Sequence, residues 1–402
     1  MTERWLSVVG IGEDGLDGLT PRGRMLVDGA EILVGGDRHF AMLPEDGREK
    51  LAWPRPLTNL MPRIADRRGT PVCVLATGDP MFFGIGVTLA KHFNADEMEI
   101  VPSLSAFSLA AARLGWALAD VEQLTLHGRP VRLAVPFIQP GARLLILADG
   151  PNTPKQVAEI LSERGYDDSR ITVLEHMGGA CERSLTGHSG DWRHGDVAAF
   201  HTLAVDCVAG ADAVILPRIP GLPDDAFISD GNMTKREIRA ATLAALAPLP
   251  GQHLWDIGAG CGSIAIEWMR AHPACRATAV ESRADRIGLI ARNANALGVP
   301  RLGMIEGEAK GVLSQLDVPD AIFIGGGAST PGLLELCWGA LSAGGRLVAN
   351  AVTLEGEGAL AAFRAANGGD LARISISRAE PVGPFTGWKS SMTVTQFAAV
   401  KS

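Results

Sequence analysis

The residues best suited to bind a nucleotide-type cofactor lie at 253–263, in the sequence HLWDIGAGCGS. An apolar run leads into Gly258, Gly260 and Gly262, and Glu281 ends the next apolar run, ATAVE. This is the order of a nucleotide-binding site, in which a strand is followed by a tight glycine turn and, about 20 positions later, by an acidic residue. The glycines let the backbone approach the ligand, and the carboxylate accepts hydrogen bonds from the ribose hydroxyls. A solvated carboxylate at a strand end is the plain alternative for Glu281.

The elements that must position this turn alternate between strand and helix. We expect strands at 254–257, 277–281, 302–305, 321–324 and 346–351, and helices at 263–271, 283–297 and 333–341. Such alternation predicts parallel strands with right-handed crossovers. The last two strands, 372–377 and 392–400, are separated by a long loop without a helix, so we expect them to form an antiparallel hairpin.

A helix is also expected just before the glycine turn. Thr234 and Glu237 have the spacing of a capping box, and an apolar stripe at helical spacing follows them. Glu237 is therefore interpreted as a capping residue, with the alternative that residues 233–237 lie over the ligand cleft.

The first half of the chain contains four predicted strands that each end in a turn rich in Gly, Ser or Asp. They lie at 6–11, 32–34, 72–76 and 99–101. Asp79 is expected to cap a helix that begins at Pro80, and a second helix is expected at 107–114. Further strand candidates at 143–148, 171–175 and 202–208 indicate a second α/β subdomain.

The composition limits the possible functions. The net charge of −8 argues against a general nucleic-acid binder, which would need a basic footprint. The six cysteines form no CxxC and no zinc-ligand spacing, so we expect reduced thiols, no metal site and a cytoplasmic protein. The N-terminus does not resemble a signal peptide, and no apolar run is long enough to span a membrane.

Two domains are expected, with a linker between them. Three prolines, at 217, 220 and 223, interrupt any regular pattern. We place the linker at 212–225, the first domain at 1–211 and the second at 226–402.

The first half resembles the tetrapyrrole methylase family through VVGIGEDGLDGLT, ATGDPMFFGIG, VPSLSAFSLAAARLG and VLEHMGGACERSLTG. The resemblance implies a cleft between two α/β subdomains that binds S-adenosylmethionine. It places cofactor contacts at Gly78, Asp79, Pro80, Ser103, Ser105 and Ala106. Relatives often carry GxGPG in the first loop, whereas this chain has Gly10-Ile-Gly12-Glu13-Asp14.

The second half resembles class I S-adenosylmethionine-dependent methyltransferases, which have a Rossmann-like sheet with an antiparallel last strand. DGNMTKREIRA, LWDIGAGCGSIAIEW, GEA and FIGGG are similar to the decarboxylating methyltransferases of the precorrin pathway. The two resemblances together imply methylation of a tetrapyrrole at C5 by the first domain. They imply methylation at C15 and decarboxylation of the C12 acetate by the second, in cobalamin biosynthesis.

The predicted site residues follow from these positions. Cofactor contacts in the second domain are expected at Gly258, Gly260, Gly262, Glu281, Gly307, Glu308 and Ala309. Substrate contacts are expected at Met233, Thr234, Arg236, Asn350, Arg378 and Trp388. Lys235, Glu237 and Lys389 are candidates for acid–base roles, although the sequence singles out no catalytic group.

Two other functional classes remain open at this point. One is an RNA or protein methyltransferase with an N-terminal accessory domain, and the other is a non-catalytic cofactor sensor. We expect a small-molecule tetrapyrrole substrate, no nucleic-acid or membrane partner, and a homo-oligomer.

Overall fold

The computed structural model describes residues 4–402, which divide into two compact units. Among the described residues, the first unit consists of residues 4–131 and 140–213, and the second of residues 132–139 and 214–402. Residues 1–3, with which the predicted first domain begins, lie outside the described part.

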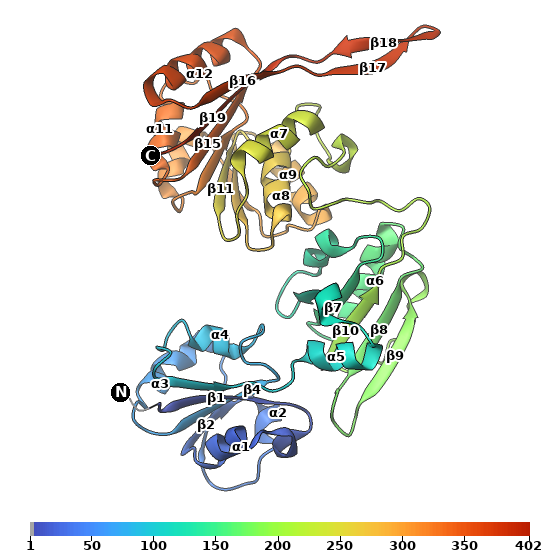
Figure 1. Ribbon diagram of the computed structural model, residues 1–402, viewed down its shortest axis with the longest axis vertical. Coiled ribbons are helices and arrows are strands. Elements are labelled where there is room, and N and C mark those ends of the chain that lie inside the picture. Colours follow the sequence, from blue (N-terminus) through green and yellow to red (C-terminus); the bar gives the residue numbers. More distant parts are fainter. Residues whose placement is uncertain (1–3) are drawn as a thin grey trace. The chain divides into compact units, whose positions relative to one another are not determined.

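The first unit begins with a five-stranded parallel sheet in the order β3-β2-β4-β1-β5. Its strands are β1 (Leu6–Ile11), β2 (Ile32–Gly35), β3 (Glu49–Ala52), β4 (Val72–Thr77) and β5 (Met98–Val101). The β1 strand is buried along its whole length, as its mostly apolar sequence predicts for a parallel strand covered on both faces. The helices around it are α1 (Pro21–Asp28), α2 (Asp37–Phe40), α3 (Met61–Ala65) and α4 (Ile85–Leu89) (Figure 1).

A second sheet in this unit has the order β6-β7-β10-β8-β9 and is mostly antiparallel. Its strands are β6 (Glu122–Thr125), β7 (Arg143–Leu147), β8 (Arg170–Glu175), β9 (Arg183–His188) and β10 (His201–Asp206). The helices α5 (Ala106–Leu114) and α6 (Thr153–Glu163) accompany it. Ser105 caps α5, and Gly115, with φ 67°, ends it.

The second unit contains a seven-stranded sheet in the order β13-β12-β11-β14-β15-β19-β16. The strands are β11 (His253–Ile257), β12 (Arg276–Glu281), β13 (Gly303–Glu306), β14 (Ala321–Ile324), β15 (Arg346–Ala351), β16 (Asp370–Ile374) and β19 (Val394–Val400). All pairs up to β15 are parallel, whereas β19 is antiparallel to both β15 and β16. The predicted α/β fold class and the antiparallel last strands are confirmed.

Helices cover both faces of this sheet (Figure 1). One face carries α7 (Arg236–Leu246), α8 (Ser263–Ala271) and α9 (Ala284–Ala296), and the other carries α11 (Leu333–Ala340) and α12 (Leu354–Asn367). The short helix α10 (Ala309–Val312) follows β13. The predicted linker at 212–225 is partly built into this core, because Leu216 and Leu222 are both buried in it.

The sequence prediction is wrong about residues 378–391, which do not form a loop. They form most of a two-stranded antiparallel ribbon made of β17 (Ser377–Val382) and β18 (Phe385–Ser390), which projects from the sheet (Figure 1). Apolar and polar residues alternate only weakly in this segment, because both faces of the ribbon are largely exposed. The helix α12 was also not predicted. Among the described residues, no helix is both long and apolar enough to cross a membrane.

Candidate functional site

A cavity of about 900 Å³ opens in the second unit at the carboxyl ends of the parallel strands. This is the edge at which open α/β sheets bind ligands. The turn after β11, the last residue of β12, the turn after β13 and the glycine run after β14 all contribute to its lining. The cavity is therefore the candidate ligand site that the sequence predicts around the glycine turn.

The glycine turn has a left-handed backbone conformation that other residues adopt only at an energetic cost. Gly258, Gly260 and Gly262 have φ values of 69°, 61° and 82°. A Cβ atom on Gly258 would lie 3.2 Å from the backbone N of Gly326 in the opposite turn. A Cβ on Gly262 would lie 3.0 Å from the side chain of Ile290, so this glycine permits close packing of α8 on α9.

Glu281 is a buried strand-end carboxylate, which removes the solvated alternative. One of its oxygens accepts from Gly260 N at 2.9 Å, and the other accepts from Arg283 N at 3.1 Å. Arg286 Nη1 lies 3.9 Å from the carboxylate. These contacts hold the carboxylate still and leave it with lone pairs that can accept further hydrogen bonds from a ligand.

Asp256, which the sequence analysis did not single out, is a second buried carboxylate in the cavity wall. Its Oδ2 accepts from Ala265 N at 3.0 Å, while Oδ1 has no partner within the described residues. Burial raises the pKa of Asp256 to about 7. The hydrogen bond from Ala265 N lowers this pKa, and the negative charge of Glu281 raises it by a smaller amount than burial does. An acidic residue inside an apolar strand, two positions before the first glycine, is the signal that could have identified it.

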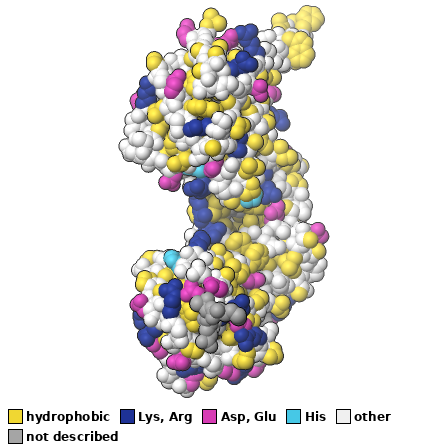
Figure 2. Space-filling view, turned by 60° about the vertical axis from the view of Figure 1, so that its left-hand side comes forward, with side chains coloured by type: hydrophobic (Ala, Val, Ile, Leu, Met, Phe, Trp, Pro, Cys, Tyr) yellow, Lys and Arg dark blue, Asp and Glu magenta, His cyan; other side chains and the backbone are white. Residues whose placement is uncertain are grey.

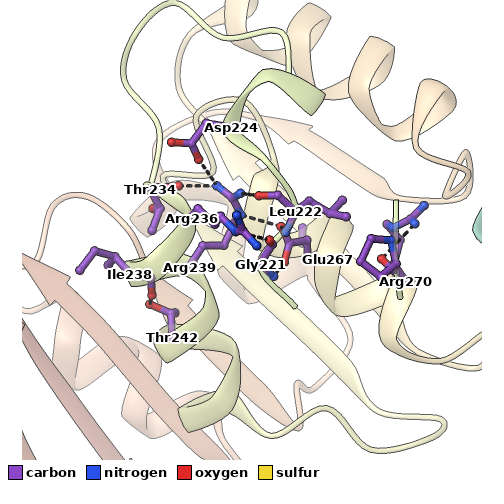
Figure 3. A network of polar contacts seen from close by, with 12 residues as sticks. Gly221, Leu222, Asp224, Thr234, Arg236, Ile238, Arg239, Thr242, Glu267 and Arg270 are labelled. Atoms are coloured by element: carbon purple, nitrogen blue, oxygen red, sulfur yellow. Dashed lines mark hydrogen bonds and ion pairs between the residues drawn. The ribbon is translucent and has the colours of Figure 1, made fainter. Parts of the chain in front are cut away.

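The segment at 221–235 carries part of the lining into the cavity, although it contains no helix beyond a single short turn. A buried ion pair anchors it, in which Arg239 Nε lies 2.6 Å from Glu267 Oε1 (Figure 3). Glu267 also accepts from the backbone N–H groups of Gly221 and Leu222, at 2.6 and 3.0 Å. Arg239 in turn donates to the carbonyl of Thr234 at 2.6 Å.

Both ends of the segment are therefore tied to one buried pair, and its middle is also held. The side chain of Asn293 hydrogen-bonds both Ile228 N and Ile228 O, and Asp230 pairs with Arg286. The segment is consequently a fixed part of the cavity wall, and its geometry depends on α7, α8 and α9.

The predicted capping box at the start of α7 is wrong. Lys235 is the N-cap residue, and it makes no side-chain capping hydrogen bond. The carbonyl of Thr234 is instead bound by Arg239, and Glu237 pairs with Arg378 at 2.7 Å. Because Glu237 lies at the cavity and its partner comes from the ribbon, this pair connects α7 to the base of the ribbon.

A buried amide network fixes Asn350 at the end of β15. Its Nδ2 donates to Thr242 Oγ1 at 2.9 Å, and its Oδ1 accepts from Gln396 Nε2 at 3.0 Å. Thr242 itself donates to the carbonyl of Ile238. The amide of Asn350 is thus held in one orientation at the cavity wall.

Most of the predicted site residues of the second domain come together in this cavity. Its lining includes Met233, Thr234, Lys235, Glu237, Gly258, Gly260, Glu281, Gly307, Glu308, Ala309, Asn350 and Arg378. Four predicted residues lie outside the lining: Gly262, Arg236, Trp388 and Lys389. Trp388 and Lys389 lie along the ribbon, where Lys389 pairs with Glu380 at 2.9 Å, and Arg236 donates to the carbonyl of Gly221.

The predicted residues of the first unit gather where β4 and β5 end. Ser103 N donates to the carbonyl of Gly78 at 3.2 Å, and a Cβ on Gly78 would lie 3.0 Å from the carbonyl of Leu104. A Cβ on Gly10 would lie 2.0 Å from the carbonyl of Gly78, so the first loop also packs against this turn. Ser105 is engaged as the N-cap of α5.

The prediction that Asp79 caps a helix beginning at Pro80 is wrong, because α4 begins only at Ile85. Asp79 Oδ1 accepts from Met81 N at 2.8 Å, which closes a turn rather than a helix. The chain then folds back over Pro80, so closely that a Cβ on Gly84 would lie 2.6 Å from the Pro80 carbonyl. Within the described residues, no group of three or more His, Cys, Asp or Glu side chains is placed to hold a metal ion.

Comparison with known proteins matches both parts of the chain. Residues 6–191 match the family described as Tetrapyrrole (Corrin/Porphyrin) Methylases, and residues 225–401 match the Precorrin methyltransferase domain. A Precorrin-6Y C(5,15)-methyltransferase (decarboxylating) from Sinorhizobium sp is 47% identical over 398 residues, which cover 99% of this chain and 96% of that protein. One of the same name from Mycobacterium tuberculosis (strain CDC 1551 / Oshkosh) is 41% identical over 397 residues, 98% of this chain and 99% of that protein.

A solved structure, the C-terminal domain of precorrin-6Y C5,15-methyltransferase from Rhodobacter capsulatus, is 45% identical with a TM-score of 0.44, covering 46% of this chain and 100% of that one. The fold and the two matched domains together define a two-part α/β methyltransferase. More narrowly, the chain belongs to the family of precorrin-6Y C(5,15)-methyltransferases (decarboxylating). Both predicted resemblances are confirmed, and an RNA or protein methyltransferase is not favoured.

Proposed function

We propose that this chain methylates precorrin-6Y at C5 and C15 and removes the carboxyl group of its C12 acetate, with S-adenosylmethionine as the methyl donor. The names of the full-length relatives support the substrate and the two positions. The observation that carries the proposal is the cavity of the second unit, in which the glycine turn and two buried carboxylates converge.

The residues of this cavity fit the cofactor. The unpartnered Oδ1 of Asp256 is an acceptor that can receive an ammonium group, and the Cβ-free Gly258 and Gly260 let backbone approach the methionine portion. Glu281 would accept from the ribose hydroxyls, with Glu308 and Ala309 beside the adenine. When bound, S-adenosylmethionine supplies an electrophilic methyl group on a sulfonium.

The remaining lining would hold the substrate. Lys235 and Arg378 are cations that can pair with the carboxylates of the macrocycle, and the fixed amide of Asn350 offers a directional contact. Met233 and Thr234 lie on the anchored segment at 221–235 and would contact the substrate from that side of the cavity. Catalysis then depends mostly on alignment of the reacting carbon, which needs no covalent nucleophile.

A second cofactor site is proposed in the first unit, at the turns after β4 and β5. Gly78, Asp79, Pro80, Ser103, Ser105 and Ala106 would hold the donor for C5. We propose that residues 1–211 and 226–402 are the two catalytic domains, and that 212–225 joins them. The six cysteines form no disulfide within the described residues, which is compatible with a reducing compartment such as the cytoplasm.

The test is to incubate the full chain and two variants with precorrin-6Y and labelled S-adenosylmethionine, and to analyse the products by mass spectrometry and NMR. The unchanged chain should add two methyl groups and remove one carboxyl group. Glu281→Ala should stop C15 methylation and decarboxylation, whereas Gly10→Val should stop C5 methylation because its side chain would collide with the Gly78 carbonyl. Loss of both methylations in each variant, or no transfer by the unchanged chain, would contradict the proposal.

We also propose that the chain is a homo-oligomer assembled through the ribbon. A two-stranded ribbon is marginal alone in water, yet this one exposes Val382, Phe385 and Trp388, with 76% of Phe385 and 79% of Trp388 accessible. Hydrophobic side chains gather at its far end (Figure 2). Light scattering should show an oligomer for the unchanged chain and a smaller species for Phe385→Asp. The control Leu354→Asp changes an exposed residue at the start of α12 and should leave the oligomer intact.

A further inference from the structure

Glu13 belongs to a cluster of four side chains, which come from separate segments of the first unit. One carboxylate oxygen of Glu13 pairs with Arg38, and the other lies 2.9 Å from His176 Nδ1. Arg38 also donates to Thr77 Oγ1 at 2.6 Å. Because Thr77 directly precedes the Gly78 turn, the cluster extends from the proposed cofactor turn to the turn after β8.

The cluster includes a residue at which this chain differs from the GxGPG pattern that is common in the tetrapyrrole methylase family. The tetrapyrrole methylase pattern GxGPG leaves no acidic side chain in the first loop, whereas this chain has Glu13 directly after Gly12. The departure is therefore tied to a specific partner, His176, in the second sheet of the same unit.

The backbone around His176 is held in an unusual conformation. His176 has φ 48°, a region that costs a non-glycine residue of order 1–3 kcal/mol and that clusters at functional sites. A Cβ on Gly179 would lie 2.8 Å from Glu13 Cβ, so the turn at 176–179 packs directly on the first loop. This close packing sustains the strained conformation and fixes the imidazole against the carboxylate.

A carboxylate bound to Nδ1 selects the tautomer whose proton lies on Nδ1, and this leaves Nε2 as an acceptor. Nε2 has no hydrogen-bond partner among the described residues, and 30% of the side chain is accessible. Hydrogen bonds from His176 and Arg38 lower the pKa of Glu13 despite the opposing effect of burial, so Glu13 remains a carboxylate. The arrangement is that of an oriented general base.

We propose that His176 Nε2 accepts the proton released when the first unit methylates its carbon substrate, with Glu13 as the positioning residue. This inference rests on the proposed function. Methylation forms one C–C bond with an electron pair from the conjugated macrocycle, and the C–S pair stays with sulfur. The macrocycle then carries one positive charge. The proton leaves the methylated carbon to Nε2, and its C–H electron pair returns to the ring, so the charges balance.

Glu13 is the charged group that contacts His176, and Arg38 and His39 lie beyond it. The guanidinium of Arg38 stacks 4.1 Å from the centre of the Phe200 ring, and burial lowers the pKa of His39 to about 4. Directly before His176 in the chain, Glu175 is buried and bound to Arg183 at 2.6 Å. It is therefore engaged elsewhere. Glu13→Gln is the informative partner variant, because it removes the carboxylate that orients the imidazole of His176.

The test compares His176→Asn with the control His188→Asn, an exposed histidine on β9 of the same sheet. Asn tolerates positive φ, so His176→Asn should fold. It should lower the rate of C5 methylation by about 10²–10⁴-fold and remove the low-pH limb of the rate profile. Its affinity for S-adenosylhomocysteine and its C15 methylation should be unchanged. Glu13→Gln should shift the low-pH limb, and His188→Asn should behave as the unchanged chain.

A measurement without turnover accompanies these assays. Nitrogen NMR of labelled histidine in the full chain should place the neutral proton of His176 on Nδ1, and Glu13→Gln should weaken that preference. A neutral proton on Nε2, or a C5 rate within twofold of normal in His176→Asn, would overturn the assignment. Failure of the unchanged chain to methylate C5 would instead overturn the proposed function, and this inference with it.

Discussion

Removal of Glu267 by Glu267→Ala tests how the wall of the second cavity is held in place. The guanidinium of Arg239 is fully buried and lies 2.6 Å from this carboxylate. Breaking one side of a buried ion pair costs about 3–5 kcal/mol, because a charge remains in the interior without its partner. The backbone N–H groups of Gly221 and Leu222 would also lose their acceptor, so the upper part of this range is expected.

The assay is hydrogen exchange measured by mass spectrometry on the full chain, because a single melting curve would mix the two units. A loss of 3 kcal/mol corresponds to about 100-fold faster exchange for the α8 amides. Peptides of the first unit provide the internal reference. Asp285→Ala, which breaks the exposed pair with Arg283, should cost less than about 1 kcal/mol.

A second variant separates the buried charge from the lost packing. Arg239→Met combined with Glu267→Leu removes both charges, so it should be less damaging than Glu267→Ala alone. Exchange in Glu267→Ala within a few-fold of normal, or a double variant as unstable as the single one, would refute the reasoning.

Three further predictions follow from single contacts. Gly262→Ala should destabilise the second unit by about 1–3 kcal/mol, because its φ is positive and the new Cβ meets Ile290 at 3.0 Å; denaturant unfolding monitored within that unit would check it. Folding raises the pKa of Asp256 from 3.8 to about 7, so between these two pH values the folded state binds a proton that the unfolded state has lost. The free energy of unfolding of the cofactor-free second unit should therefore fall by about 4 kcal/mol as the pH rises from 4 to above 7. Asp256→Asn should flatten that pH dependence, and an unchanged slope would exclude Asp256 as its source. Gly179→Ala should cost about 1–3 kcal/mol and disturb Glu13, because the added Cβ would lie 2.8 Å from its Cβ; chemical shifts of His176 would report the change.

The sequence predicts the second fold well because its signals are local. The apolar run at β11, the glycine turn and the helix at 263–271 follow from residues adjacent in the chain, and α8 has the predicted bounds. Glu281 is found by spacing alone. The sequence does not reveal that Asp256 is buried with its Oδ1 unpartnered within the described residues, or that backbone hydrogen bonds hold the Glu281 carboxylate in place.

Long-range contacts explain the predictions that are wrong. Thr234 and Glu237 have the local pattern of a capping box, but α7 begins one residue later than that pattern needs, with Lys235 as N-cap, and the Glu237 carboxylate pairs with Arg378. The pairing of Glu13 with His176 spans 163 positions, so no local pattern could reveal it. The ribbon was missed because its strands face solvent on both sides and lack a clean apolar alternation.

Two separate cofactor sites in one chain should be visible in the stoichiometry of cofactor binding. Titration calorimetry of the full chain with S-adenosylhomocysteine measures this stoichiometry, with Glu281→Ala and Gly10→Val as site-specific variants. We predict two equivalents bound per chain, and one equivalent in each variant. A single equivalent in the unchanged chain, or two in Glu281→Ala with unaltered affinity, would contradict the account.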